Sequence, residues 1–294
     1  MKLNEKAEAD QIARSPKKMD RGPLQQLFQL SLAQPWLETR QAELFETMDL
    51  CQDVHEQSLV CDLLFRFKYI PADTLNDCLI QMGDRVTNAW GCAPETTKIV
   101  AINRSDYSDS SQHILWLLKP IFADHHGWDT TSFVAKMSDA IPHTGNENSI
   151  VLIDEFSGTG GTLAKAVRWY RQKLEENGVS AKIYVCCLAA MEKGIEKIQQ
   201  EADDVFVCHV LKRGISDHFE GEALASAVAM MERLEDELAP KIGRELLSKY
   251  NFGYKRSEAL YYFQNGNPVN NLFPIFWWKE IKRKSDWRPI FRRI

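Results

Sequence analysis

The stretch that decides the fold is SIVLIDEFSGTGGTL, residues 149–163. It begins with an apolar run, Ile150–Ile153, of the kind that fills a strand buried on both faces of a parallel sheet. Asp154 and Glu155 follow at the carboxyl end of this predicted strand, and a loop then leads into an amphipathic helix at about Leu163. Open α/β sheets bind ligands beyond the carboxyl ends of their strands, so this pattern predicts a binding site here.

The loop between the acidic pair and the helix has the chemistry of a sugar-phosphate site. Glycines permit φ > 0 and bring backbone N–H groups against a phosphate, and the positive end of the helix adds to the attraction. Asp154 and Glu155 can accept hydrogen bonds from two ribose hydroxyls or hold Mg²⁺ through water. A Walker-type loop fits less well, because no lysine follows the glycines; a ligand-free turn is the alternative. The predicted phosphate-binding residues are Ser157, Gly158, Thr159, Gly160, Gly161 and Thr162.

Four apolar residues, two acids, a short spacer and Thr-Gly-Gly-Thr resemble the phosphoribosyl diphosphate (PRPP) loop of type I phosphoribosyltransferases. The resemblance implies that Asp154 and Glu155 orient the ribose 2′- and 3′-hydroxyls, as catalytic residues and indirect Mg²⁺ ligands. It also implies that residues 157–162 surround the 5′-phosphate. In the 6-oxopurine enzymes an aspartate of this loop faces the base, and Gly158 stands at that position here. Purine salvage of that type is therefore not expected, whereas orotate-type chemistry is not excluded.

Strands and helices alternate on both sides of this motif. Apolar runs predict strands at residues 97–103, 181–191 and 204–211, and amphipathic segments predict helices at 163–176 and 192–201. Such alternation predicts an α/β fold with a doubly wound parallel sheet, which agrees with the phosphoribosyltransferase fold. A helical N-terminal region and a C-terminal helix with a β and aromatic extension complete the predicted architecture.

A polar loop, RSDYSDSS at residues 104–111, follows the first predicted strand of the sheet. Its position fits the loop that binds pyrophosphate in phosphoribosyltransferases, which makes Arg104 a candidate catalytic residue and Ser105 a candidate substrate ligand. Asp106 and Asp109 would repel pyrophosphate unless Mg²⁺ bridges them, and a capped turn explains the segment equally well. A helix is expected at residues 112–119, ending at Pro120.

Residues 123–148 form a short polar segment with one strand-like piece at 132–137. By resemblance it corresponds to a flexible catalytic loop, from which Lys136 or His143 could act. His125 and His126 are adjacent, but no third ligand lies at a convincing spacing, so an exposed loop is favoured over a metal site.

Bulk composition is that of a soluble globular protein. The 294 residues are 44% hydrophobic and 26% charged, with a net charge of −5, which gives no general attraction to nucleic acid or membranes. No apolar run approaches membrane-spanning length. The seven cysteines lack disulfide or zinc spacing, so reduced thiols in a cytoplasmic protein are expected.

The predicted organisation has four parts. Residues 1–22 are a flexible start, 23–95 a helical region that serves as a cap or partner-docking surface, 96–220 the core, and 221–294 a C-terminal unit. Two helices, 58–67 and 73–89, are expected either side of Tyr69–Pro71, the second capped by Asp73 or Thr74.

The C-terminal unit begins with a long predicted helix, residues 220–247, and continues to strand-like residues 260–263 and an asparagine-rich turn. Asparagine tolerates the left-handed conformation and its amide can pair with a base edge, so Asn270 and Asn271 are candidate substrate ligands; a packing turn is the alternative. Basic residues of the tail, Lys279–Arg293, lie near tryptophans, so the tail could contact nucleic acid through charge and stacking, or an acidic protein partner. A charge run at a chain end is more often simply solvated, and that alternative is favoured.

Taken together, the loop, the helical front and this C-terminal pattern resemble phosphoribosyltransferase-like proteins of bacterial conflict and anti-phage gene clusters, including retron-type ones. The resemblance implies a defence effector, or toxin, that binds PRPP or a related nucleotide with Mg²⁺ and acts on a nucleotide or macromolecular target. Its partner would be a reverse transcriptase, its noncoding RNA–DNA, or another defence protein. The alternatives are a non-catalytic PRPP or nucleotide sensor and a hydrolase of nucleotide ribosyl bonds.

Overall fold

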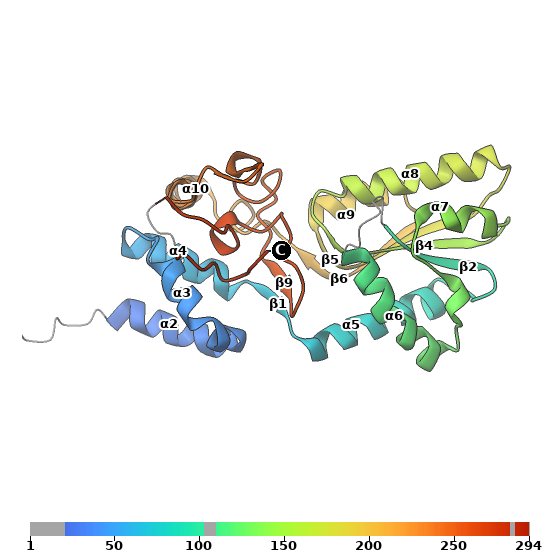
Figure 1. Cartoon of the computed structure of the whole chain (residues 1–294), viewed down its shortest axis with the longest axis horizontal. Coiled ribbons are helices and arrows are strands. Elements are labelled where there is room, and N and C mark those ends of the chain that lie inside the picture. Colours follow the sequence, from blue (N-terminus) through green and yellow to red (C-terminus); the bar gives the residue numbers. More distant parts are fainter. Residues whose placement is uncertain (1–20, 103–109, 283–285, 294) are drawn as a thin grey trace, which may run out of the picture.

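A five-stranded parallel sheet forms the centre of the computed structural model, which describes residues 21–102, 110–282 and 286–293 (Figure 1). The strand order is β3–β2–β4–β5–β6. The register places Val151 of β4 between Ile99 of β2 and Tyr184 of β5. The fold class is confirmed. The strands are β2 (Thr97–Ala101), β3 (Phe133–Val134), β4 (Ser149–Ser157), β5 (Lys182–Met191) and β6 (Asp204–Leu211).

Helices cover both faces of this sheet. α5 and α6 pack on the face to which Val151 and Ile153 contribute, and α7, α8 and α9 pack on the face of Ile150 and Leu152 (Figure 1). All four β4 side chains are fully buried, and each burial contributes roughly 1.5–3 kcal/mol to stability. The covering elements are α5 (Ala72–Asp84), the π-helical turn η2 (Arg85–Ala89), α6 (Ser110–His126), η3 (Thr130–Ser132), α7 (Met137–Ala140), η4 (Ile141–His143), α8 (Gly161–Glu176) and α9 (Glu192–Gln199).

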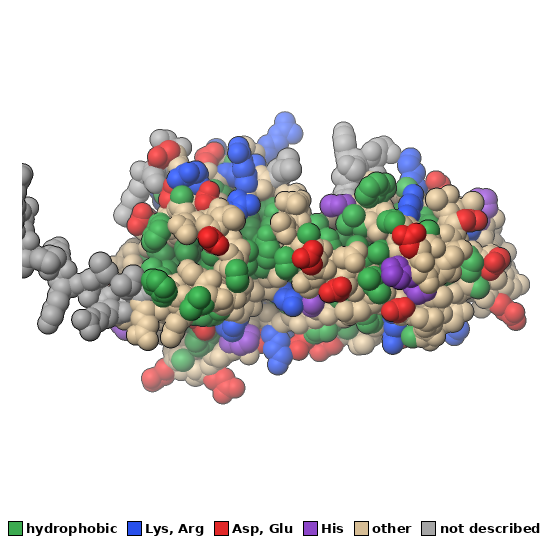
Figure 2. All heavy atoms as spheres, turned by 90° about the horizontal axis from the view of Figure 1, so that it is seen from below, with side chains coloured by type: hydrophobic (Ala, Val, Ile, Leu, Met, Phe, Trp, Pro, Cys, Tyr) green, Lys and Arg blue, Asp and Glu red, His purple; other side chains and the backbone are tan. Residues whose placement is uncertain are grey.

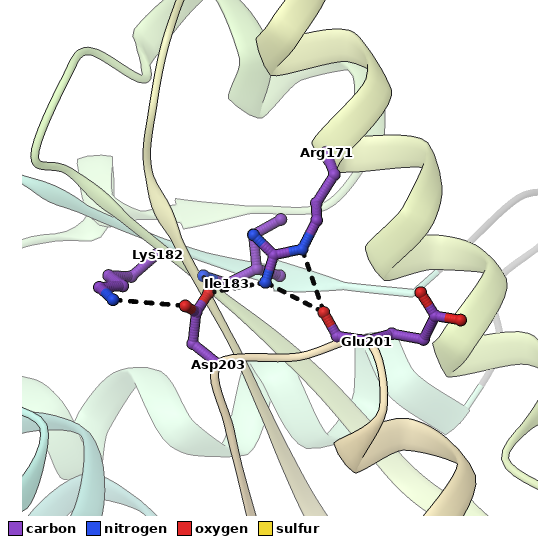
Figure 3. Close-up of polar contacts among 5 residues, drawn as sticks. All are labelled: Arg171, Lys182, Ile183, Glu201 and Asp203. Carbon is purple, nitrogen blue, oxygen red and sulfur yellow. Dashed lines mark hydrogen bonds and ion pairs between the residues drawn. The ribbon is translucent and has the colours of Figure 1, made fainter.

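A polar cluster around Asp203 fixes α8 to the amino ends of β5 and β6 (Figure 3). The Asp203 carboxylate accepts from the Ile183 N–H at 2.8 Å and pairs with Arg171 at 3.0 Å and with Lys182 at 3.4 Å. Burial opposes ionisation of this carboxyl, but the Ile183 N–H and the Arg171 guanidinium hold its pKa below the ordinary value. Arg171 also donates to the Glu201 carbonyl at 3.0 Å. The cluster therefore fixes the amino-terminal ends of these strands, at the opposite end of the sheet from the predicted site.

The N-terminal and C-terminal parts of the chain form a second body with one shared core (Figure 1). Its short parallel ladder pairs β1 with β9, so that Lys68 lies opposite Tyr261. Helices do lie on either side of residues 69–71, as expected, and β1 in the segment between them is a strand that was not predicted. The elements are α2 (Arg21–Ala33), η1 (Pro35–Arg40), α3 (Gln41–Met48), α4 (Val54–Phe65), β1 (Lys68–Ile70), α10 (Gly221–Asp236), β7 (Lys241–Ile242), β8 (Glu245–Leu246), η5 (Leu247–Lys249), β9 (Tyr261–Phe263) and η6 (Pro274–Phe276).

Aromatic stacking joins the two ends of the chain in this second body. The Trp36 ring stacks on Tyr69 with centroids 4.8 Å apart and on Phe291 at 5.4 Å, and Phe291 stacks on Tyr262 at 4.3 Å. Such pairs add roughly 0.5–1.5 kcal/mol each beyond the area they bury. The regions predicted separately as 23–95 and 221–294 therefore pack together, while α5 and η2 pack on the sheet.

Two predicted helix ends were wrong. α6 continues through Pro120 to His126, and the carbonyl that Pro120 leaves unpaired belongs to Trp116, which lies on the exposed side of the helix where water can satisfy it. α10 ends at Asp236 rather than at residue 247, because Pro240 cannot donate a helical hydrogen bond and Gly243 turns the β7–β8 hairpin at φ 56°.

Three further local predictions differ from the structure. α5 has Pro71 as its N-cap, so Asp73 and Thr74 lie inside the helix. His125 and His126 lie in the last turn of α6 rather than in a loop, and the His126 ring is almost fully buried 3.7 Å from Asp84. Of the strand predicted at residues 132–137, only Phe133–Val134 is formed, as the edge strand β3.

Several large apolar side chains of the N-terminal helices reach solvent. Phe28, Leu32 and Phe45 are mostly exposed, and hydrophobic side chains gather at this end of the face shown in Figure 2. Over the rest of that face, acidic and basic side chains of the described residues are interspersed.

A buried acid at the end of α10 makes folding stability depend on pH. Burial raises the pKa of Glu235 from 4.5 to about 8, although its Oε1 accepts from the Phe252 N–H at 2.8 Å. A raised carboxyl pKa favours the protonated folded state, so this stability is complete below about pH 4.5 and is lost as pH rises through about 8. The free energy of unfolding should fall between pH 5 and pH 9 in the wild type. In Glu235→Gln we expect this fall to be smaller by on the order of 4 kcal/mol. Urea unfolding at both pH values measures the difference, and equal losses in the two proteins would contradict the assignment.

Candidate functional site

A cavity of about 600 Å³ lies where β4 ends against the segment that follows β9. The β4 strand supplies two carboxylates, α6 supplies one edge, and the asparagine-rich segment and the chain's tail supply the rest. The cavity thus brings together parts of both bodies of the fold. Its lining residues are Ser110, His113, Asp154, Glu155, Phe156, Phe263, Asn265, Gly266, Asn267, Pro268, Val269, Asn270, Asn271 and Arg293.

The acidic pair lies within β4, because the strand runs on to Ser157 rather than ending at Ile153. Asp154 stays in register with Cys187 of β5 and accepts, through Oδ1, from the Glu155 N–H at 2.8 Å. Glu155 has no partner residue in the pairing of β4 with β5, and the pairing continues in the same register at Phe156. Both acidic residues line the cavity, so the predicted sugar- and metal-binding pair lies at this site.

The glycine loop is held by close backbone packing. Gly160 has φ 68° and serves as N-cap of α8, and a Cβ on it would lie 2.3 Å from the Gly194 carbonyl oxygen of α9. A Cβ on Gly158 would lie 2.1 Å from Nδ2 of Asn271. Gly160 therefore cannot be replaced without a shift of backbone, and a side chain at position 158 would have to displace the Asn271 amide. The loop therefore lies between α9 and the asparagine-rich segment, with the N-terminus of α8 behind it.

The first N–H groups of α8 make this loop suited to an anion. Helices leave their first four N–H groups without intrahelical partners, and the aligned peptide dipoles place positive potential there. The Ala164 N–H already bonds to the Gly160 carbonyl at 2.9 Å, so the donors that remain belong to the residues before it. Gly158 and Thr159 also line a second cavity of about 420 Å³, next to Lys193 and Arg256.

The two candidate asparagines have different surroundings. Asn270 lines the main cavity, and its carbonyl accepts from the Tyr254 N–H at 2.8 Å. The Asn271 amide donates to Ser257 Oγ at 2.8 Å while its side chain packs on Gly158. Asn271 therefore positions the glycine loop, and direct contact of either asparagine with a substrate stays a prediction.

Two predicted site residues, Arg104 and Ser105, lie outside the described residues. Neither Lys136 nor His143, the candidates from the predicted catalytic loop, lines either cavity.

Sequence reasoning missed Arg293 and His113 as cavity residues. The Arg293 guanidinium lies over the Trp277 ring at 4.8 Å, and burial lowers the pKa of Arg293 below its ordinary value. Arg293 thus brings a positively charged residue to the lining of the same cavity as the carboxylates of β4. In the sequence it is one of several basic tail residues, and nothing local marks it, since only the fold brings the tail to the cavity.

The tryptophans predicted to stack on nucleic-acid bases are buried instead. Trp278 donates its indole N–H to the Ala239 carbonyl at 2.9 Å, and Trp287 donates to the Trp278 carbonyl at 2.8 Å. Trp277 donates to the Leu272 carbonyl, and Arg288 pairs with Glu46 at 3.0 Å. The stacking part of that prediction is wrong, while nucleic-acid contact through the charges of Lys279–Arg293 stays a prediction.

The donor set at the cavity fits a magnesium ion that substrate and water largely coordinate. Mg²⁺ is usually bound through one or two carboxylates with waters and substrate phosphates, and Asp154 and Glu155 supply two carboxylates. Among residues 21–102, 110–282 and 286–293, no group of three or more His, Cys, Asp or Glu side chains could hold a metal by itself. The same residues contain no helix long and apolar enough to cross a membrane.

Solved structures similar to part of the chain include three phosphoribosyltransferases. APRTase from Giardia lamblia complexed with 9-deazaadenine is 20% identical, with 48% of this chain and 84% of that chain covered and a TM-score of 0.32. Adenine phosphoribosyl transferase from Trypanosoma brucei is 18% identical, with 51% and 72% covered and a TM-score of 0.32. Orotate phosphoribosyltransferase from Aeropyrum pernix is 13% identical, with 46% and 69% covered and a TM-score of 0.29. No curated protein matches the chain.

A family model extends over nearly the whole molecule. The model PRTase-CE matches residues 48–293, which include the acidic pair, the glycine loop, the asparagine-rich segment and Arg293. The chain belongs to the PRTase-CE family of phosphoribosyltransferase-like proteins.

Proposed function

We propose that this protein binds PRPP, or a related phosphorylated ribose nucleotide, with Mg²⁺ and transfers the phosphoribosyl group to an acceptor. One observation carries the proposal: Asp154 and Glu155 line the same cavity as the segment that packs on the glycine loop. A sugar held by the carboxylates would place its 5′-phosphate toward the N-terminus of α8, where N–H donors and helix potential favour an anion.

The residues of the chain would act mainly by positioning. Asp154 and Glu155 would orient the ribose and would hold Mg²⁺, largely through water; Mg²⁺ held there would supply positive charge against the pyrophosphate group. Arg293 would add positive charge at the cavity wall, of which the asparagine-rich segment also forms part. Displacement of pyrophosphate from C1 by an acceptor nucleophile completes the reaction.

Calorimetric titration of PRPP in the presence of Mg²⁺ tests the proposal, followed by assays of pyrophosphate release with a panel of acceptors. Binding with acceptor-dependent pyrophosphate release is expected. Binding without any product would instead identify a PRPP sensor, and release of the base from nucleotides without pyrophosphate would identify a hydrolase. Failure of PRPP and of nucleoside monophosphates to bind overturns the assignment of the ligand.

We further propose that this activity serves anti-phage defence in the bacterial cytoplasm, with a reverse transcriptase, its RNA–DNA or another defence protein as partner. The support is the resemblance of the loop, helical front and C-terminal pattern to proteins of such gene clusters. Plating efficiency of phage on cells that express the complete gene cluster tests the role. Equal plating with the wild type and with a variant that cannot bind PRPP would exclude it.

Arg293 gives the cavity a residue-level test. We expect Arg293→Gln to weaken PRPP binding by about tenfold, because a charged hydrogen-bond donor contributes roughly 1.5 kcal/mol or more to a phosphate contact. Arg292 is the matched control, since it is adjacent but exposed and does not line the cavity. Calorimetry on Arg293→Gln and Arg292→Gln, with melting temperatures to exclude unfolding, decides the point; equal affinities in the two variants would remove Arg293 from the site.

A further inference from the structure

A thiol pair and a histidine meet between α5 and the edge strand β6, apart from the candidate cavity. The Cys78 Sγ of α5 lies 3.2 Å from Nε2 of His209, and the Cys208 thiol donates to the Cys78 carbonyl at 3.6 Å. Cys208 and His209 are consecutive on β6, which has a neighbour on one side only in the described sheet. Cys78 therefore contacts both residues at one edge of the sheet, His209 through its side chain and Cys208 through its backbone carbonyl.

The charged form of Cys78 is favoured by these neighbours. The neighbouring Cys208 thiol and His209 ring, together with the charge of Lys68, lower the pKa of Cys78 to about 5 despite burial. Loss of a proton from the Cys208 thiol is correspondingly disfavoured. A thiolate rather than a thiol is the nucleophile in sulfur chemistry, and the neighbours of Cys78 favour its thiolate.

The other cysteines show the opposite behaviour. Burial and the nearby Glu56 carboxylate raise the pKa of Cys51 to about 12, although Cys51 is partly exposed. Burial raises the pKa of Cys61 to about 11. Cys186 and Cys187 are fully buried within β5. Cys78 thus differs from the remaining thiols by its partners rather than by its exposure.

We propose that Cys78 and Cys208 form a peroxide-reactive dithiol, in which Cys78 is the attacking thiolate, His209 the proton carrier and Cys208 the resolving thiol. Hydrogen peroxide is the oxidant. It is small enough to approach from the open edge of the sheet, where Cys208 and His209 are partly exposed.

The reaction has two steps. The Cys78 thiolate attacks one peroxide oxygen, the O–O bond breaks, and the departing hydroxide takes a proton from His209 to leave as water, giving a sulfenic acid. Neutral His209 then takes the proton of Cys208, whose sulfur attacks the Cys78 sulfur. The S–O bond breaks as the S–S bond forms, and the hydroxide leaves as a second water with that proton. Two thiols are oxidised and one peroxide is reduced to two waters.

The ring of one buried residue, Tyr261, connects the surroundings of this cluster to the wall of the candidate cavity. Tyr261 is fully buried, its ring stacks on Phe156 with centroids 5.1 Å apart, and Phe156 lines the cavity. Burial and the nearby carboxylate of Glu155 and thiol of Cys78 raise the pKa of Tyr261. A disulfide between Cys78 and Cys208 would link α5 covalently to β6 near this wall of the cavity.

Treatment of the folded protein with hydrogen peroxide, followed by thiol counting in denaturant and peptide mapping, tests the proposal. We expect the seven free thiols to fall by two, with one disulfide that joins the Cys78 and Cys208 peptides. Cys51 is the control for simple exposure. Loss of Cys51 before Cys78, or no loss of thiols, would overturn the proposal.

Two variants separate the roles. Cys208→Ser should stop the reaction at a Cys78 sulfenic acid that dimedone traps, and His209→Gln should slow loss of the Cys78 thiol by about tenfold. Wild-type protein that accumulates the sulfenic acid while Cys208 stays a thiol would exclude Cys208 as the resolving residue. Unchanged kinetics in His209→Gln would exclude proton transfer by that histidine.

Discussion

Joint replacement of the acidic pair, Asp154→Asn with Glu155→Gln, is expected to lower PRPP affinity at least about a hundredfold. Both amides keep the size of the side chain but lose its charge, so the cavity keeps its shape while two charged acceptors disappear. Hydrogen bonds to charged groups contribute roughly 1.5–3 kcal/mol each, and two such losses exceed 3 kcal/mol. Calorimetry with PRPP and Mg²⁺ measures the change.

A control with the same change in charge distinguishes the cavity from the general field of the protein. Glu175 and Glu176 are exposed at the end of α8, and neither lines the cavity. The Glu175→Gln, Glu176→Gln double variant should bind PRPP like the wild type. Retained PRPP binding in the β4 variant would show that the carboxylates do not hold the sugar.

Replacement of Gly160 by alanine is expected to destabilise the fold by about 3 kcal/mol and to weaken ligand binding. The new Cβ would lie 2.3 Å from the Gly194 carbonyl oxygen, which is backbone and cannot rotate away, and φ of 68° adds strain for an L-residue. The loop must therefore move off α9 or α9 must shift. Urea unfolding measures the loss of stability.

Gly161 offers the matched comparison in the next position. A Cβ there would be 3.5 Å from Thr159 Oγ1, an ordinary contact, and Gly161 begins α8 with helical backbone. Gly161→Ala should change stability by less than about 0.5 kcal/mol. Similar destabilisation by both substitutions would mean that contact with Gly194 does not cause the loss of stability in Gly160→Ala.

The sheet was predictable because its strands are apolar on both faces. The prediction for residues 204–211 has the same bounds as β6, and that for 181–191 differs from β5 by one residue. The acidic pair and the glycine loop were found because their chemistry is local in sequence. Each of these features is set by neighbouring residues, and local patterns suffice for them.

Features that depend on contacts between residues far apart in the chain could not be predicted from the sequence. Nothing near residues 68–70 shows that they pair with residues 261–263, because three residues carry too little periodicity to predict a strand. Arg293 reaches the cavity only because Phe291 is fixed among the aromatic rings of the second body. The burial of Trp278 and Trp287 follows from that same packing, which no local pattern reports.

The parallel pairing of β1 with β9 has a consequence for the rate at which the molecule folds. Contacts between residues so far apart in the chain require the closure of a very long loop, and such closure slows folding. The central sheet, whose strands lie closer together in sequence than β1 and β9, can assemble first and bring the two ends together. The asparagine-rich wall, which directly follows β9, then forms last, so refolding protein should regain the spectrum of the sheet before it regains affinity for a ligand.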